Sequence, residues 1–205
     1  APGLSPAGAI PGGVCAGPAP MGFGHALQNN QPDHNFVPTL GPGMVNGLGV
    51  LDDMNALEIG GFDTTGDNVH DFPVYFSLNR FSPSLGGATP GDVLLSPTGT
   101  NFFFVFAPRP TLGLRAGDNV DALAIWDRNA TGQREAGIDY AIFSLDPNSP
   151  TLAGPDGIWG TPDDFSPGDI FVTDFSGVAC LYVRHNRIGL QFNDNLDALD
   201  VIVLP

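Results

Sequence analysis

Short apolar runs, each bounded by glycine, proline or a polar turn, recur along the chain. Eight of them are rich in aromatic and branched side chains and lie at residues 74–78, 92–95, 102–106, 121–126, 140–145, 169–173, 179–183 and 197–203. Runs of this length and composition predict β-strands. Because no longer stretch carries the apolar stripe of an amphipathic helix, the pattern predicts an all-β fold with two sets of four strands.

The start of the fourth run repeats near the end of the chain. Residues 117–123 read GDNVDAL and residues 193–199 read NDNLDAL, and a looser copy, LGVLDDMNALEI, occupies residues 48–59. Taking Asn55, Asp121 and Asp197 as equivalent, the copies lie 66 and 76 residues apart. Spacing of this kind indicates repeated structural units. We expect one domain over 1–205, with a degenerate unit at about 25–60, units at about 74–126 and 140–203, and a Gly/Pro-rich extension at 1–24.

The connections between the runs also repeat, and they are short. A Pro-Thr-Leu or similar turn recurs at residues 38–41, 83–86, 110–113 and 150–153, and Pro-Gly-Asp precedes two strands, at 90–92 and 167–169. Tight turns join antiparallel strands, whereas parallel strands need long crossovers. We therefore expect antiparallel sheets built from tandem four-strand units in a sandwich-like packing. A propeller- or prism-like radial repeat is the alternative, although the unit is long for a propeller blade.

The charge narrows the classes of partner. The formal net charge is −15, all seven basic residues are scattered arginines, and only 14% of residues are charged. Nucleic acids need clustered cationic side chains, so we expect no nucleic-acid partner. No apolar run approaches the roughly 20 residues of a spanning helix, so we expect no membrane insertion.

Two features favour an extracellular protein. The first residue is Ala1, which fits a mature chain whose leader has been removed. The two cysteines, Cys15 and Cys180, would form a disulfide that ties the N-terminal extension to a late strand; two buried thiols are the alternative.

Twenty of the twenty-two acidic residues are Asp, which suits turns and hard-cation sites, so we searched the loops for calcium ligands. Residues 127–135, DRNATGQRE, resemble the first half of an EF-hand calcium loop, in which alternate side-chain oxygens wrap the ion around a glycine bend. The resemblance ends at position 12, where Ile138 stands in place of the glutamate. A plain hairpin turn is the alternative. The candidate ligands are Asp127, Asn129, Thr131, Glu135 and Asp139.

Two other loops are candidates for calcium. Residues 154–164, GPDGIWGTPDD, form an insertion in the later unit and carry Asp156, Asp163 and Asp164 around a glycine-rich bend. Residues 63–71 carry Asp63, Asp67 and Asp71 at four-residue spacing. For both loops the alternative is a solvated surface loop. The repeated acids of residues 118–121 and 194–197 are better explained as turn residues that accept backbone hydrogen bonds.

Catalytic motifs are missing from the sequence. It has no lysine, no Gly-x-Ser-x-Gly elbow, no His-Glu-x-x-His and no metal-type histidine spacing. We expect no enzyme, no catalytic residue and Ca²⁺ as the bound ion. The sequence predicts a secreted, calcium-stabilised structural or adhesive protein that self-associates or contacts extracellular matrix or glycan. The alternatives are a carbohydrate-binding module that uses aromatic platforms (Trp126, Trp159 or Tyr182) and a glycan-active enzyme.

Overall fold

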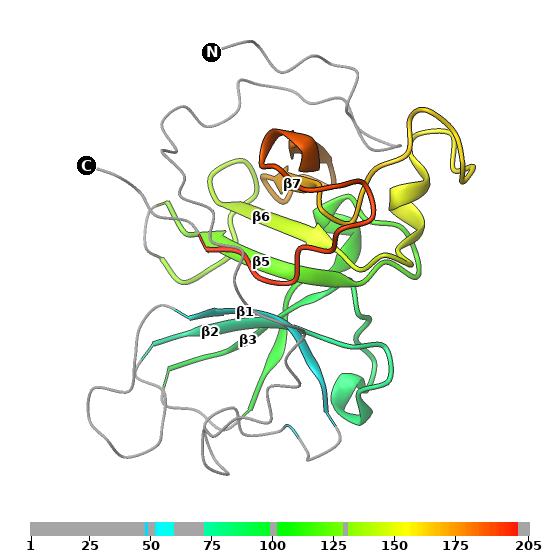
Figure 1. The fold of residues 1–205 in the computed structure, drawn as a ribbon. Helices are drawn as coiled ribbons and strands as arrows, with labels where there is room; N and C mark the ends of the chain where they lie inside the picture. Colours follow the sequence, from blue (N-terminus) through cyan, green and yellow to red (C-terminus); the bar gives the residue numbers. More distant parts are fainter. Residues whose placement is uncertain (1–47, 49–51, 60–71, 99–101, 129–130, 201–205) are drawn as a thin grey trace.

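The computed structural model describes residues 48, 52–59, 72–98, 102–128 and 131–200, and the fold is all-β (Figure 1). It contains strands and short 3-10 turns but no α-helix among these residues. The strands are β1 Met54–Ile59, β2 Val74–Leu78, β3 Val93–Ser96, β4 Phe104–Ala107, β5 Val120–Trp126, β6 Tyr140–Leu145, β7 Ile170–Thr173 and β8 Ala179–Val183. The 3-10 turns are η2 Pro83–Leu85, η3 Arg109–Leu112, η4 Pro150–Ala153 and η5 His185–Arg187.

The strands form two antiparallel sheets of four, each in chain order. We call β1-β2-β3-β4 the lower sheet and β5-β6-β7-β8 the upper sheet, as they stand in Figure 1. Phe76 pairs with Leu94, and Phe143 with Phe171. The register shifts within the β1–β2, β3–β4, β5–β6 and β7–β8 pairings. Two stacked sheets confirm the predicted all-β, sandwich-like class, and the strands described close neither a barrel nor a propeller.

The sheets begin one strand earlier than the sequence units did. They span residues 54–107 and 120–183, whereas the predicted units ran over about 74–126 and 140–203. The copies at residues 52–57 and 118–123 therefore form the first strand of their sheets. The long 60–73 connection separates the first copy from the strand that it pairs with, so the sequence did not place the two in one unit. At the C-terminal end, residues 197–200 form no strand. The N-terminal extension and the first part of the predicted degenerate unit lie outside the described residues.

Side chains from both sheets fill one core between them. The lower sheet contributes Tyr75 and Phe106, the upper sheet contributes Phe143 and Phe171, and Phe175 joins them from the β7–β8 turn. The ring of Phe106 meets Tyr75 edge-on at 4.9 Å and Phe175 at 5.9 Å between centroids. Such edge-to-face contacts add stability beyond the burial of apolar area.

The outer faces of the two sheets are also apolar and buried. Below the lower sheet lie Val74, Phe76, Leu78 and Leu94. On the outer face of the upper sheet, a second cluster contains Ala122, Ala124, Ile142, Ile170, Val172, Leu196 and Leu199. In an ordinary antiparallel sandwich the outer faces are polar. These sheets instead resemble inner layers of a taller stack.

The sheets stack in one direction and do not face each other as mirror halves. Tyr75 of β2 and its equivalent Ile142 of β6 both lie on the side of their sheet that faces the next segment of chain; Phe76 and its equivalent Phe143 lie on the other side. The outer face of the upper sheet is thus the counterpart of the inner face of the lower sheet.

A serine on each sheet marks the step from one layer to the next. The hydroxyl of Ser77 in β2 donates to the carbonyl oxygen of Val120, the first residue of β5, at 2.7 Å. The hydroxyl of Ser144, its equivalent in β6, donates to the carbonyl oxygen of Leu196. Residues 190–199 therefore approach the upper sheet as residues 114–123 approach the lower one.

None of the helical segments in the described ranges is long or apolar enough to cross a membrane.

Candidate functional site

Aspartates of the repeated turns hold the connections together. Asp118, fully buried, accepts hydrogen bonds from the backbone N–H of Thr151 at 2.8 Å, the hydroxyl of Thr151 at 2.6 Å and the backbone N–H of Arg115. Burial raises the pKa of the Asp118 carboxyl, although these hydrogen bonds act in the opposite direction. The turn role predicted for this residue is confirmed.

The same arrangement occurs one unit earlier. Asp52 accepts hydrogen bonds from the N–H of Ser84 at 2.8 Å and from its hydroxyl at 2.5 Å. Next to it, the backbone N–H of Asp53 donates to the hydroxyl of Ser82, which donates back to the carbonyl oxygen of Asp53. The backbone of Asn119 and the hydroxyl of Ser149 make the same pair of hydrogen bonds. The repeated acids are therefore structural links between the first strand of each sheet and the turn that follows its second strand.

A second pair of aspartates accepts backbone hydrogen bonds at the other end of each sheet. Asp92 accepts from the N–H groups of Thr89 and Arg109, each at 2.6 Å. Asp169 accepts from the N–H groups of Ser166 at 3.0 Å and His185 at 2.7 Å, and its Oδ1 lies 2.7 Å from Nδ1 of His185. The repeated Pro-Gly-Asp motif that precedes these strands is the signal by which sequence alone finds them.

In the first predicted calcium loop, the carboxylates of the described residues accept hydrogen bonds from within the loop. Asp127 accepts from the N–H groups of Thr131 and Gly132. The buried Asp139 accepts from those of Arg128 and Glu135, and the hydroxyl of Thr131 donates to Glu135 at 3.0 Å. Asn129 lies outside the described residues. These hydrogen bonds fit the alternative, a hairpin turn, and the calcium prediction for this loop stays a prediction.

The second predicted loop brings its oxygen atoms to one point. The hydroxyl oxygen of Thr161 lies 2.6 Å from Oδ1 of Asp163 and 3.3 Å from Oδ1 of Asp164. It also lies 3.5 Å from Oδ1 of Asp156 and 3.0 Å from the carbonyl oxygen of Ile158. A hydroxyl has one proton and donates to one acceptor at a time, so the other three oxygens approach it without a donor between them.

The base of this loop is fixed by Gly154 and Arg115. Gly154 has a φ of +66°, and a Cβ there would stand 2.5 Å from the carbonyl oxygen of Asp163. The guanidinium of Arg115 donates to the carbonyl oxygens of Pro150 and Gly154, each at 3.0 Å. These contacts fix the start of the loop that carries the three acids. The hydroxyl of Thr161 lowers the pKa of the Asp163 carboxyl, so that carboxyl is ionised at neutral pH.

The oxygen ligands of this loop suit calcium, but they do not form a complete coordination site. Oxygen ligands at 2.3–2.6 Å from a calcium ion stand about 3 Å apart, and the oxygens of Ile158, Asp163 and Asp164 lie at 2.6–3.3 Å from the Thr161 hydroxyl oxygen. Within the described ranges, however, no three or more His, Cys, Asp or Glu side chains are grouped as ligands for a metal ion. The acids converge on the Thr161 hydroxyl and not on a shared cavity, so binding needs a small adjustment of the loop.

The third predicted loop, with Asp63, Asp67 and Asp71, lies outside the described residues. So does Cys15, and the Cys15–Cys180 bridge stays a prediction.

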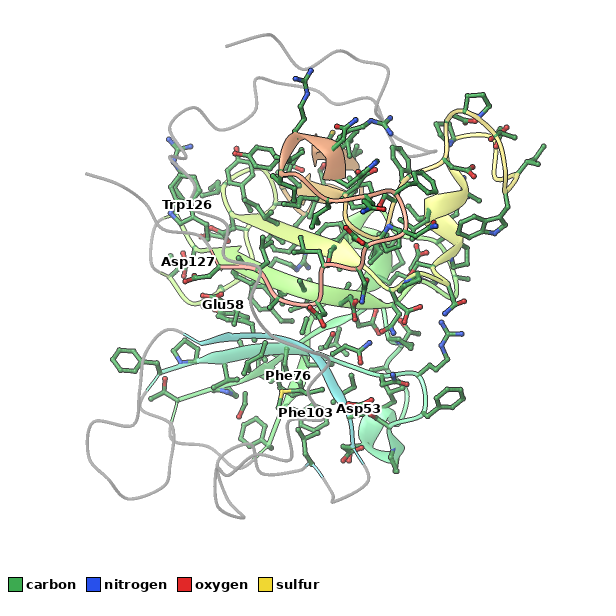
Figure 2. The ribbon with its side chains drawn as sticks, viewed as in Figure 1. Asp53, Glu58, Phe76, Phe103, Trp126 and Asp127 are labelled. Carbon is green, nitrogen blue, oxygen red and sulfur yellow. The ribbon has the colours of Figure 1, made fainter. Side chains whose placement is uncertain are left out.

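Three aromatic residues were expected to form platforms for sugars. Trp159 is 55% exposed at the tip of the 154–164 loop, and Ile158 beside it is 60% exposed. Trp126 stacks on Tyr140 at 5.9 Å between ring centroids, on the opposite side of the molecule from that loop (Figure 2). Tyr182 is half-buried against the outer cluster of the upper sheet. Trp126 and Trp159 therefore do not share one surface.

The structure contains an acidic cluster between the sheets that sequence reasoning missed. Glu58 of β1 lies beneath Asp127 at the edge where the sheets meet (Figure 2). Burial first, and then the charge of Asp200, raise the pKa of Glu58 to about 7. Burial also raises the pKa of Tyr75 to about 12, with further contributions from Asp127, Asp139 and Glu58. One of only two glutamates in the chain is thus held in a poorly solvated, negatively charged position.

This position predicts a pH dependence of stability. The folded-state pKa of Glu58 lies above its ordinary value of 4.5, so the folded state holds this proton more tightly. The contribution is complete below pH 4.5 and is lost as pH rises through about 7, at a cost of about 3 kcal/mol. We expect Glu58→Gln to remove that loss.

Urea unfolding of both proteins between pH 4 and 8 measures this difference. Glu135→Gln makes the same charge change outside the cluster and serves as the control. Parallel stability curves for the native protein and Glu58→Gln would show that the Glu58 carboxyl is well solvated.

Comparison of the chain with protein-family models, with curated proteins and with solved structures finds no match.

Proposed function

We propose that this protein is a secreted, calcium-stabilised β-repeat protein with a structural or adhesive role in an extracellular assembly. One observation carries the calcium part of the proposal: four acceptor oxygens, from Asp156, Ile158, Asp163 and Asp164, gather within 3.5 Å of one hydroxyl. Oδ1 of Asp156 also accepts from the N–H of Ile158, but the carboxylates of Asp163 and Asp164 place negatively charged oxygens beside the same hydroxyl, an arrangement that a hard cation stabilises.

The composition supports the same conclusion. A formal charge of −15 gives strong self-repulsion in the folded state, and bound divalent cations reduce it. A calcium held by Asp156, Asp163 and Asp164 would neutralise charge in a loop that projects from the body of the fold (Figure 1). Extracellular calcium concentrations suit sites of modest affinity such as this one.

The stacked layers support a structural role. Both faces of β2, β3 and β7 are buried, and the aspartates of the turns are used for hydrogen bonds within the scaffold. In repeat proteins, stability comes from contacts between neighbouring units, and the units build extended surfaces. A Cys15–Cys180 disulfide belongs to the same extracellular proposal.

Terbium luminescence tests the calcium site locally. Tb³⁺ replaces Ca²⁺ in oxygen sites, and Trp159 lies in the loop, two residues from Thr161, close enough to sensitise its emission. We expect emission on Trp excitation that excess Ca²⁺ abolishes, and its loss in Asp163→Asn/Asp164→Asn. Trp159→Phe, the control, should lose emission but keep Ca²⁺ binding in calorimetry. Native protein without sensitised emission and without calorimetric heat would refute the site.

A second candidate function is carbohydrate binding through the loop tip. The exposure of Trp159 and Ile158 favours it, because an exposed tryptophan ring offers a stacking face for a sugar. A glycan array comparing the native protein with Trp159→Ala separates this role from a purely structural one. A glycan-active enzyme, the third expectation, has no specific observation in its favour among the described residues.

A further inference from the structure

Three residues carry the buried side-chain atoms that have no hydrogen-bond partner in the described part of the chain. These atoms are Oγ1 of Thr89, Nε of Arg109, and both Nδ2 and Oδ1 of Asn119. Asn119 is 1% exposed, and Thr89 and Arg109 are partly buried. Buried polar atoms of folded proteins are nearly always hydrogen-bonded, so exceptions that occur together point to a bound water or ion.

One turn, residues 89–92, brings the three residues together. A Cβ at Gly91 would stand 3.0 Å from Cγ of Arg109 and 3.1 Å from the carbonyl oxygen of Asp118, the residue directly before Asn119. Thr89 lies two residues before Gly91 in the same turn. The missing side chain at Gly91 therefore allows the Arg109 side chain to pack against the backbone at the start of β5.

The equivalent turn of the upper unit, residues 166–169, has the same framework. A Cβ at Gly168 would stand 3.2 Å from Cβ of His185 and 3.1 Å from the carbonyl oxygen of Asp194. In this unit each of the three equivalent side chains has a protein partner. Ser166 donates to the carbonyl oxygen of Phe192 at 2.6 Å, Nδ1 of His185 lies 2.7 Å from Asp169, and Nδ2 of Asn195 donates to Asp121 at 2.7 Å. The lower unit thus keeps the framework but carries side chains that the described protein does not satisfy.

The guanidinium of Arg109 brings a positive charge to this turn. The ion pairs of the described residues are those of Asp169 with Arg184 and His185, and Arg109 takes part in neither. The carboxylate of Asp92 accepts from the backbone N–H groups of Thr89 and Arg109, each at 2.6 Å. A partly buried guanidinium without an ion pair, close to a hydroxyl and an amide, suits an oxyanion.

We propose that Arg109, Thr89 and Asn119 bind a small oxyanion of the hydrogen phosphate type. The Nε–H of Arg109, the hydroxyl of Thr89 and the amide N–H groups of Asn119 donate to its oxygens, and Oδ1 of Asn119 accepts from its P–OH group. Free phosphate and the phosphate monoester of a small molecule share this chemistry. The site uses no residue of the 154–164 loop, so it is independent of calcium.

A ³¹P NMR titration of the full chain with inorganic phosphate, in calcium-free buffer at neutral pH, tests the site. The net charge of −15 opposes anion binding, so we expect saturable broadening with a dissociation constant of about 1 to 10 mM. Arg109→Gln should weaken binding about tenfold and Thr89→Val about threefold, because they remove one charge-assisted and one neutral hydrogen bond. Both variants keep the backbone hydrogen bonds to Asp92.

Arg128→Gln is the matched control, because it removes the same charge from an exposed arginine outside the turn. It should bind phosphate as the native protein does. Methyl phosphate as a second probe separates the two sources: binding as tight as that of phosphate indicates a monoester, and weaker binding indicates the free ion.

Two results would overturn the proposal. One is a native protein that leaves the phosphate resonance unchanged. The other is equal binding by the native protein, Arg109→Gln and Thr89→Val, which would place the anion elsewhere. A crystal structure grown in phosphate locates the ion directly: we expect phosphate density at Nε of Arg109, and water alone at that atom would contradict the site.

Discussion

Asp118→Ala is expected to lower the free energy of unfolding by about 4 kcal/mol, because it leaves two backbone N–H groups and one hydroxyl buried without their acceptor. Each unsatisfied buried group costs about 1–3 kcal/mol, and partial relaxation brings the total below the sum. Chemical denaturation of the two proteins at neutral pH measures the difference.

Asp194→Ala is the matched control, since it makes the same change at the equivalent position of the third copy. There the carboxyl receives one hydrogen bond at a half-buried site, so the cost is about 1 kcal/mol. Equal losses for the two variants would mean that the links from Asp118 to Thr151 do not hold the connection together.

Removal of calcium is expected to lower the melting temperature by roughly 10 °C. A ligand at a hundred times its dissociation constant stabilises the folded state by about 3 kcal/mol, and each kcal/mol shifts the melting temperature of a chain of this size by about 2–4 °C. Calorimetry with excess calcium and with excess chelator gives the two melting temperatures.

The double variant Asp163→Asn/Asp164→Asn tests whether the effect comes from the 154–164 loop. It keeps the size of both side chains but removes their charges, so its melting temperature should not respond to chelator. A native protein whose melting is indifferent to chelator would remove calcium from this account, and a variant that still responds would assign the ion to another loop.

The strands were predictable because their signal is local. Aromatic and branched runs between glycine and proline turns placed β2, β3, β4, β5, β6, β7 and β8 to within a few residues. The repeated DAL motif likewise predicted the turn role of Asp118, since a short carboxylate before a strand bonds to nearby N–H groups. The frame of the units differed, because the first strand of the lower sheet stands far from the second in sequence. In addition, residues 197–200, the start of the last predicted strand, form no strand.

The features that depend on long-range packing were not predictable. Glu58 is unremarkable in sequence, and its raised pKa arises only when the fold buries its carboxyl and brings Asp200 near it. The crowding around Thr161 depends on the bend at Gly154, whose positive φ no composition rule specifies. The direction of stacking required knowing which side of each strand faces which cluster.

A crystal structure of the calcium-loaded protein, with anomalous data collected at long wavelength, tests the central claim most directly. We predict an anomalous peak beside Thr161, within coordination distance of carboxylate oxygens from Asp156, Asp163 and Asp164 and of the carbonyl oxygen of Ile158. Density that shows these acids bound only to Thr161, to backbone N–H groups and to water, with no anomalous peak in the loop, would contradict it.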